Sequence, residues 1–228
     1  MENTGYTTLS RQSGLAREMQ IVTNNIANAA TTGFRAVQSV DAGVSLSIGQ
    51  GNIGNTSFEQ GPLTQTNGTF DLAIEGDGFF LVETPAGERL TRAGAFSPSG
   101  EGDLMTYDGY RVLDAGGTPV FVPPGETIAV ASDGTLSANG APIGQVGIVR
   151  PLDASAMVRE DGVMFRADAG FEPSESARVL QGFVENSNVS AIGQLARMIE
   201  VQRAYELGQS FLESEDERVR TAMKSITT

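Results

Sequence analysis

Residues 15–29 read LAREMQIVTNNIANA, and their pattern sets what the start of the chain can form. The apolar positions recur at intervals of 4, 3, 4 and 3 residues, at Leu15, Met19, Val22, Ile26 and Ala29. These intervals are those of a coiled-coil a/d seam, which is narrower than the apolar face of an ordinary surface helix. The spacing predicts a helix from Glu2 to about Asn28 that packs against other helices.

The next residues, Ala30-Thr31-Thr32-Gly33, are predicted to end this helix. Gly33 can take a positive φ there and so act as the hinge at which the chain leaves the helix. Phe34 is expected to pack where the helix meets the following part of the chain. Asn25 and Asn28 lie on and beside the seam, where buried amides can fix the register between subunits. The alternative is a solvated face near a helix end.

A second long helix is predicted from Asn186 to about Ser225, with Ser187 or Asn188 as its N-cap. A seam with intervals of 3, 4 and 3 residues is formed by Ile192, Leu195, Ile199 and Gln202. Arg203 and Tyr205, with Gln202, are expected to make hydrogen bonds and ion pairs between subunits, or else with neighbours on their own helix. A helix of this length without internal caps needs packing partners.

The middle of the chain alternates short apolar stretches with Gly-rich turn signals, a pattern typical of an antiparallel meander, sandwich or open barrel. Strands are predicted at 70–74, 79–83, 89–92, 110–113, 120–122, 127–131, 146–150 and 163–167. The predicted fold class is α+β. We expect residues 1–35 and 186–228 to form a helical assembly domain, 36–69 an extended connecting segment and 70–185 a β domain. The two terminal helices are expected to pair, which leaves apolar surface for neighbouring subunits.

Composition argues against enzymatic chemistry. The chain has no His and no Cys, and its one Lys is Lys224. The commonest general base near neutral pH and the usual zinc ligands are therefore missing, and we expect no catalytic residues, no metal and no cofactor. Two acidic pairs, Glu75 with Asp77 and Glu160 with Asp161, leave open a carbohydrate-active enzyme that uses two carboxylates. In turns of an acidic protein such pairs are usually solvated.

Net charge and hydropathy argue against several classes of partner. A formal charge of −13 disfavours nucleic acid and anionic membrane surfaces. No stretch approaches the length of an apolar membrane span, so no membrane insertion is expected. Met1–Leu9 lacks the basic start and apolar run of a secretory signal, which predicts export without a cleavable signal peptide.

Several stretches resemble one family. The motif NNIANAATTGFR at 24–35 closely resembles the N-terminal motif of bacterial flagellar rod and hook proteins. Further stretches are similar to that family in the same order along the chain: FDLAIEGDGFF at 70–80, LTRAGAF at 90–96, VENSNV at 184–189 and MIEVQRAYE at 198–206. The resemblance covers the whole chain.

The resemblance implies a structural subunit of the basal-body rod, exported by the flagellar type III apparatus and assembled in the periplasm, where the rod carries torque from rotor to hook. It implies helical ends that fold on assembly. Expected partners are copies of this chain, other rod proteins, the rotor-side base of the rod and the distal rod. The opening MENTGY is most similar to proximal rod subunits, whereas Gly193–Ala196 and Leu207-Gly208 depart from the family pattern and keep a distal paralogue open. Without the resemblance, a carbohydrate-active or adhesive β-domain protein is the alternative.

Overall fold

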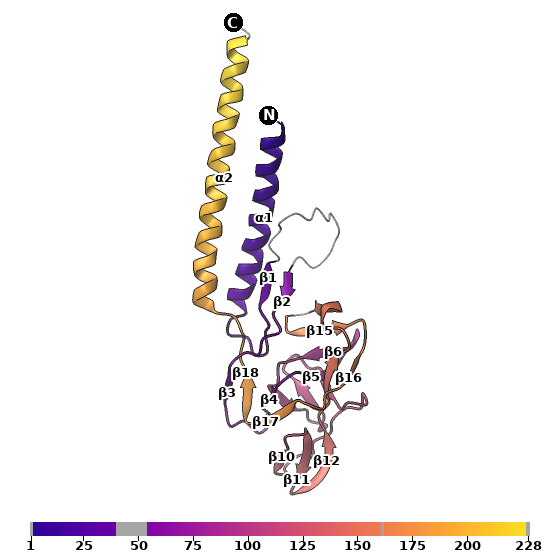
Figure 1. Cartoon of the computed structure of the whole chain (residues 1–228). Coiled ribbons are helices and arrows are strands. Elements are labelled where there is room, and N and C mark those ends of the chain that lie inside the picture. Colours follow the sequence, from indigo (N-terminus) through magenta and orange to yellow (C-terminus); the bar gives the residue numbers. More distant parts are fainter. Residues whose placement is uncertain (1, 40–53, 161, 227–228) are drawn as a thin grey trace. The chain divides into compact units, whose positions relative to one another are not determined.

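The computed structural model describes residues 2–39, 54–160 and 162–226. It has the predicted α+β fold, with long helices near both ends and β structure between them (Figure 1). The chain divides into two compact units. The helical unit takes the residues up to Ala29, 36–57 and those from Val189 on, and the β unit takes 30–35 and 58–188.

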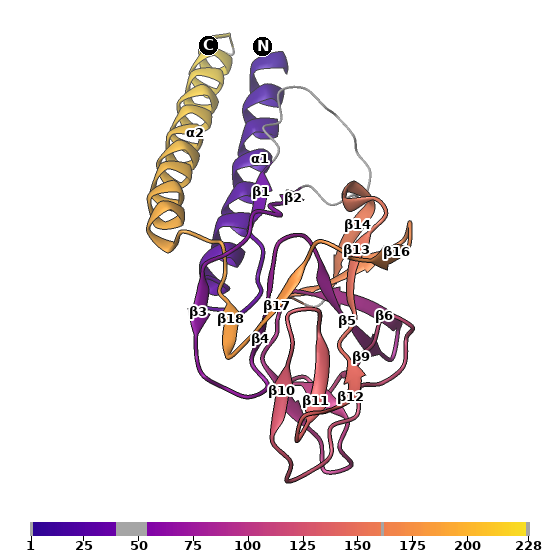
Figure 2. The ribbon, with the colours of Figure 1, turned by 60° about the horizontal axis from the view of Figure 1, so that its bottom comes forward.

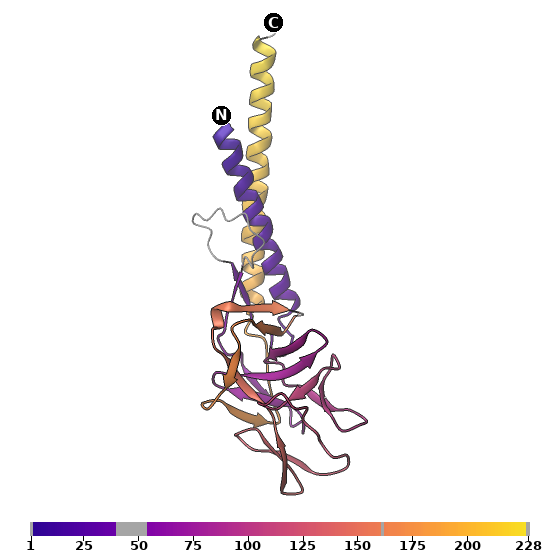
Figure 3. The same ribbon diagram turned by 90° about the vertical axis from the view of Figure 1, so that its right-hand side faces the viewer.

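The helical unit is built on an antiparallel pair, α1 (Glu2–Ala27) and α2 (Ala191–Ile226). The two helices lie side by side in Figures 1 and 2, and in Figure 3, where one overlaps the other, the N and C marks again stand at the same end of the pair. This confirms the predicted pairing of the terminal helices. At a rise of about 1.5 Å per residue, α2 is about 54 Å long and α1 about 39 Å.

The start of α2 differs from the prediction. Ser190 is the N-cap, because its hydroxyl accepts the N–H of Gly193 at 3.3 Å and its carbonyl accepts the N–H of Gln194 at 2.9 Å. The predicted cap Asn188 has another use, since its side-chain amide donates to the carbonyl of Glu59 at 2.8 Å within the β unit. The helix therefore begins at Ala191, two or three residues after the start that the predicted caps would give.

The strands of the chain are β1 (Val37–Ser39), β2 (Gly54–Thr56), β3 (Leu63–Gln65), β4 (Leu72–Glu75), β5 (Phe79–Thr84), β6 (Gly87–Thr91), β7 (Phe96–Pro98), β8 (Leu104–Thr106), β9 (Arg111–Leu113), β10 (Ile128–Val130), β11 (Thr135–Ala138), β12 (Ala141–Gln145), β13 (Ile148–Pro151), β14 (Met157–Glu160), β15 (Met164–Ala167), β16 (Phe171–Pro173), β17 (Arg178–Gln181) and β18 (Phe183–Glu185). A 3₁₀ turn, Ala154–Ala156, precedes β14. All the strand pairings are antiparallel.

The central strand of the β unit is β5, which pairs with β6, β9 and β13. Both of its faces are buried: Phe80 and Val82 belong to one apolar cluster, and Phe79 and Leu81 belong to another. Phe79 and Phe80 are therefore core residues on opposite faces of the strand. The ring of Phe80 meets that of Phe96 edge to face, with centroids 5.1 Å apart.

The predicted strand at 120–122 is wrong. Val120 and Val122 are buried, but this segment makes single links to several neighbours and no ladder. The N–H of Val120 donates to the carbonyl of Val112 at 2.9 Å, and the carbonyl of Val120 accepts the N–H of Leu104 at 2.9 Å. The alternation of apolar residues correctly predicted that this segment is buried. It could not distinguish a strand from a buried segment of irregular backbone.

The predicted connecting segment 36–69 is divided between the two units. Its first part contains β1 and β2, which pair with each other in the helical unit. Its last part contains β3, which pairs with β18 in the β unit. The sequence of β3 is polar, and its partner lies about 120 residues away, so local pattern did not reveal it.

One edge of the β unit is notable. The three-stranded sheet has the order β10-β11-β12, so one side of β12 has no partner strand among the residues that the structure describes. All the side chains of β12 are exposed. Pro142 lies opposite Ser137 in the ladder, and the register shifts between Leu136 and Ser137.

Candidate functional site

The two helices contact each other along a seam. The residues that α1 contributes to it were predicted, whereas those that α2 contributes were not. On α1, Val22 is buried and Leu15 and Met19 are half-buried, as their spacing predicts. On α2, the buried or half-buried positions recur at intervals of 4, 3, 4, 3 and 4 residues, at Gln194, Met198, Val201, Tyr205, Gly208 and Leu212. This α2 seam mixes polar, small and apolar residues, which is why hydropathy alone did not find it.

Contacts along the seam confirm the antiparallel register. The guanidinium of Arg197 donates to the carboxylate of Glu18 at 2.6 Å, and this hydrogen bond raises the pKa of Arg197. Farther along, a Cβ added at Gly208 would lie 3.4 Å from Cγ of Gln12. That is an ordinary van der Waals distance, so the Gln12 side chain lies directly over Gly208, where Gly costs about 1 kcal/mol relative to Ala.

The predicted α2 seam lies on a different face. Ile192 is 83% exposed, and Leu195 and Ile199 are each 50% exposed. We call these three residues the apolar stripe. Gln202 and Arg203 are exposed near it, whereas Tyr205 turns toward α1 and is half-buried. Exposed Ile and Leu side chains spaced along one helix face are typical of a surface that is buried in an assembly.

Two grooves flank the seam of the helix pair. One, of about 430 Å³, is lined by Arg11, Gln12, Leu207 and Phe211, among others. The other, of about 340 Å³, is lined by Ala16, Met19, Val201, Gln202, Tyr205 and Glu206. Leu15 borders both grooves. Their apolar floors are wide enough to receive aliphatic side chains.

The amide of Asn25 is used inside the chain. Asn25 is 1% exposed, and its side chain accepts the N–H of Val37 at 2.9 Å and donates to the carbonyl of Val37 at 2.8 Å. It thus ties the start of β1 to α1 and is buried within the single chain, not on a solvated face. Asn28 donates to the carbonyl of Asn24 at 2.9 Å, one turn back. Ile26 is half-buried.

Replacing Asn25 with Ala is expected to loosen β1 from α1. The variant leaves the N–H and C=O of the half-buried Val37 without the side chain that bonds them, at a cost of about 2 kcal/mol. Amide hydrogen exchange at Val37 should become about 30-fold faster, since 1.36 kcal/mol corresponds to a factor of ten. Asn24→Ala, which alters an exposed neighbouring amide, is the matched control and should leave the rate unchanged. Equal exchange in the two variants would contradict the role of Asn25.

Gly33 has the predicted positive φ, +71°. A Cβ there would lie 2.3 Å from the backbone nitrogen of Ala93, so both conformation and space require glycine. The side chain of Phe34 is 1% exposed and is packed within the β unit. The hinge residues therefore belong to the β unit, although they follow directly on α1.

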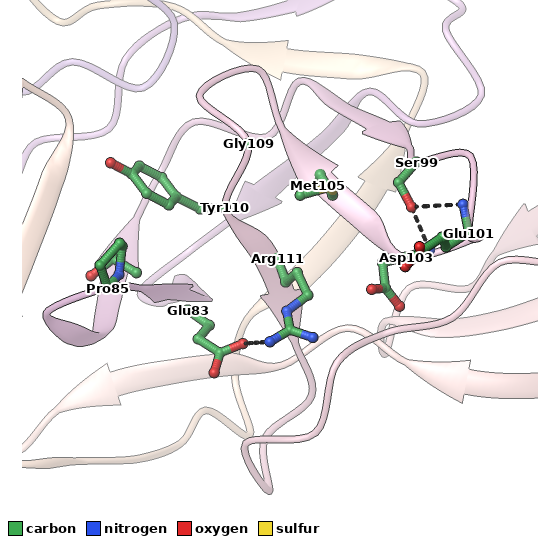
Figure 4. Close-up of a pocket in the computed structure, with 10 residues that line it drawn as sticks. Glu83, Pro85, Ser99, Glu101, Asp103, Met105, Gly109, Tyr110 and Arg111 are labelled. Carbon is green, nitrogen blue, oxygen red and sulfur yellow. Dashed lines mark hydrogen bonds and ion pairs between the residues drawn. The ribbon is translucent and has the colours of Figure 1, made fainter.

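The β unit has a depression of about 510 Å³ whose lining includes three acidic side chains, Arg111 and Tyr110 (Figure 4). Several of its polar groups bond to one another. Arg111 and Glu83 form an ion pair at 2.7 Å, and the hydroxyl of Ser99 accepts the N–H groups of Glu101 and Asp103. Both members of the ion pair are more than two-fifths exposed, which typically makes such a pair worth under about 1 kcal/mol.

The acidic pairs considered for carbohydrate chemistry do not form such a site in the described chain. Glu75 and Asp77 are exposed, and Glu160 is held by Arg89 at 2.6 Å and by Arg166. Asp161 lies outside the described residues. Among the residues that the structure covers, no group of three or more acidic side chains is placed to bind a metal ion. Within the same part of the chain, neither long helix combines the length and apolarity needed to cross a bilayer.

Comparison with known proteins defines the class of the chain. Three family models match it: "Flagella basal body rod protein" over residues 6–35, "Flagellar hook protein FlgE/F/G D1 domain" over 73–138 and "Flagellar basal body rod FlgEFG protein C-terminal" over 180–225. The first and last matches cover most of α1 and α2, and the middle match lies in the β unit. Together they place the chain among the axial proteins of the bacterial flagellum.

Relatives that match over nearly their whole length identify the family within this class. A "Flagellar basal-body rod protein FlgF" of Caulobacter vibrioides is 36% identical over 99% of this chain and 98% of its own length. Another FlgF, from Mesorhizobium japonicum, is 35% identical over 97% of this chain and 98% of its own length. A "Flagellar basal-body rod protein FlgG" of Bacillus subtilis is 29% identical over 93% of this chain and 94% of its own. The chain belongs to the flagellar basal-body rod protein family, with greater similarity to these FlgF relatives than to this FlgG.

Proposed function

We propose that this chain is a structural subunit of the proximal part of the flagellar rod and that it assembles through the apolar stripe of α2. The observation that carries this proposal is the exposure of Ile192, Leu195 and Ile199 on a helix whose opposite face is already filled by α1. Each subunit thus has one seam that is buried between α1 and α2 and one apolar surface that is exposed in the single chain. The FlgF relatives, which match over nearly the whole chain, support the proximal position.

The occupant of the stripe is the helix pair of a neighbouring subunit, either a copy of this chain or another rod protein of the same family. The grooves beside the seam offer aliphatic and aromatic walls to the Ile and Leu side chains of a neighbour. Burial of apolar area stabilises such contacts by about 25 cal/mol per Å², and repetition along the rod multiplies it. A shaft made of many packed helices resists twisting, which suits the transmission of torque.

The remaining parts of the proposal concern partners and location. The subunit contacts the rotor-side base of the rod and the distal rod, is located in the periplasm, and is exported by the flagellar type III apparatus without a cleavable signal peptide. It acts without cofactor, metal or catalytic residues. The lack of His and Cys and the charge of −13 support a role that requires neither chemistry nor nucleic acid.

The test is to purify detergent-resistant basal bodies from the source organism and to identify their proteins by mass spectrometry. We expect this chain at a few copies per particle, together with other rod proteins. Recovery of the other rod proteins without this chain would overturn the proposal and favour a soluble β-domain function.

A further inference from the structure

The backbone passes between the two units four times, at residues 29/30, 35/36, 57/58 and 188/189. On the β-unit side, these crossings are marked by the two ends of the segment Ala30–Arg35, by Phe58 and by Asn188. Nothing in the sequence separation requires these points to meet, because Phe58 and Asn188 are 130 residues apart. In the structure, the crossings at 35/36, 57/58 and 188/189 come together around one side chain.

That side chain is Arg35, which is 1% exposed. Its guanidinium donates to the carbonyls of Phe58, at 3.2 Å, and of Glu59. It also forms an ion pair with Glu185 at 2.8 Å. The last crossing joins the same group, since Asn188 donates its backbone N–H to the carbonyl of Phe34 at 3.3 Å and its side-chain amide to the carbonyl of Glu59.

Glu185 is the counter-charge of this cluster and is also 1% exposed. Besides Arg35, its carboxylate accepts the N–H of Gly61 at 3.0 Å and lies 3.6 Å from the guanidinium of Arg92. Its backbone carbonyl accepts the N–H of Gly33 at 2.7 Å. One residue thus contacts the segment that follows α1, the segment that precedes β3 and the loop after β6.

Backbone segments also approach one another closely in this cluster, at two glycines. A Cβ on Gly61 would lie 2.0 Å from the carbonyl oxygen of Asn186, as one on Gly33 would collide with Ala93. From the other side, the guanidinium of Arg159 stacks on the rings of Phe34 and Phe165, 4.7 and 4.9 Å from their centroids. It also donates to the carbonyl of Arg35 at 2.5 Å.

Burial acts on the charges of all three arginines. It lowers the pKa of Arg92 to about 10, against the opposing attraction of Glu185, and lowers that of Arg159 to about 10. Burial also lowers the pKa of Arg35, again opposed by Glu185. The guanidiniums of Arg35 and Arg92, both buried, remain charged at neutral pH and share the buried carboxylate of Glu185. Removal of the Glu185 carboxylate is therefore expected to destabilise this cluster more than removal of one member of an exposed ion pair would destabilise its surroundings.

We propose that Arg35 is the anchor that gathers three of the four chain crossings at one joint of the β unit, and that Glu185 is the positioning residue that holds Arg35 there. The fourth crossing, at 29/30, leads within the same segment to Gly33, whose N–H donates to the carbonyl of Glu185. A force that travels along the backbone through the three crossings enters the β unit at this joint. Loss of Glu185 releases the Ala30–Arg35 segment while the apolar clusters around β5 stay folded, because none of their buried members touches Glu185 through a polar contact. The inference does not depend on the rod assignment.

The test is limited trypsin digestion of the full chain with the Glu185→Gln substitution. Trypsin cleaves after Arg35 only when this buried side chain is released, and mass spectrometry detects the fragment that begins at Ala36. Cleavage after Arg89, which is buried in β6 and paired with Glu160, reports unfolding of the β unit itself. We expect cleavage after Arg35 to become about 100-fold faster, since breaking a buried pair leaves uncompensated charge. Cleavage after Arg89 should stay within about twofold of the wild-type rate.

Glu172→Gln is the matched control, because it makes the same chemical change in the exposed Arg150–Glu172 pair and should leave both rates unchanged. If Glu185→Gln does not fold, Asn188→Ala removes one neutral hydrogen bond to Glu59 and should speed cleavage after Arg35 about fivefold. Unchanged cleavage after Arg35 in the folded Glu185→Gln protein, or in Asn188→Ala when that variant has to stand in, overturns the proposal. So does a parallel rise after Arg89, which would make the cluster ordinary core.

Discussion

Ile199→Asp is expected to abolish incorporation of the chain into basal bodies and, with it, swimming motility. Ile199 is the last residue of the apolar stripe and is half exposed in the single chain, so a carboxylate there remains hydrated and both units fold. In an assembled interface the same carboxylate would be buried without a partner. Its desolvation costs several kcal/mol, which corresponds to at least a hundredfold loss of affinity at each contact.

The measurement is the amount of the variant in purified basal bodies from a strain that makes no wild-type copy. Ile199→Leu, which keeps the volume and apolarity of the side chain, is the control and should assemble normally. Circular dichroism of the purified variants should show equal helix content. Normal incorporation of Ile199→Asp would show that the stripe is not an assembly contact. Ile26 is a less decisive position for the same test, because it is half-buried within its own chain.

Phe80→Ala should destabilise the β unit by about 3–5 kcal/mol. The ring of Phe80 is fully buried on the central strand and packs edge to face on Phe96, so its removal leaves a cavity that the surrounding sheet cannot easily close. This is a large fraction of the stability of an ordinary domain. Urea unfolding followed by circular dichroism at a β-sheet wavelength should show a lower midpoint with an unchanged slope.

The matched control is Phe121→Ala, which removes the same side chain at a position that is 51% exposed. Its effect should stay below about 1 kcal/mol. A loss of similar size in both variants would mean that the cluster around Phe80 does not dominate the stability of the β unit. Hydrogen exchange in α1 and α2 should be the same in both variants if the two units unfold independently.

Sequence patterns predicted those parts of the fold that depend on local periodicity. The seam of α1 was found because Leu15, Met19 and Val22 are apolar at coiled-coil spacing, and β5 was found because both of its faces are apolar. The turn at Gly33 followed from the conformational freedom of glycine. These features need no knowledge of the partner that they pack against.

The missed features depend on contacts between distant residues. β3 and β18 are short and partly polar, and each is a strand because it pairs with the other. On α2, hydropathy selected Ile192, Leu195 and Ile199, whereas the face against α1 includes Gln194 and Gly208, which fit by shape and hydrogen bonding. The pairing of Arg35 with Glu185 was not predicted, because a single charged residue in each motif gives no sign that the two meet.

The free edge of β12 bears on how closely copies of the β unit can be packed without aggregating. An edge strand with a complete row of free N–H and C=O groups invites other sheets to extend it, which is a route to aggregation. Pro142 has no N–H to offer, and the shift of register beside it interrupts the row. Where many copies are held close together, this edge is a poor template for intermolecular β-sheet, so the β units can be packed at high density and still remain separate sheets.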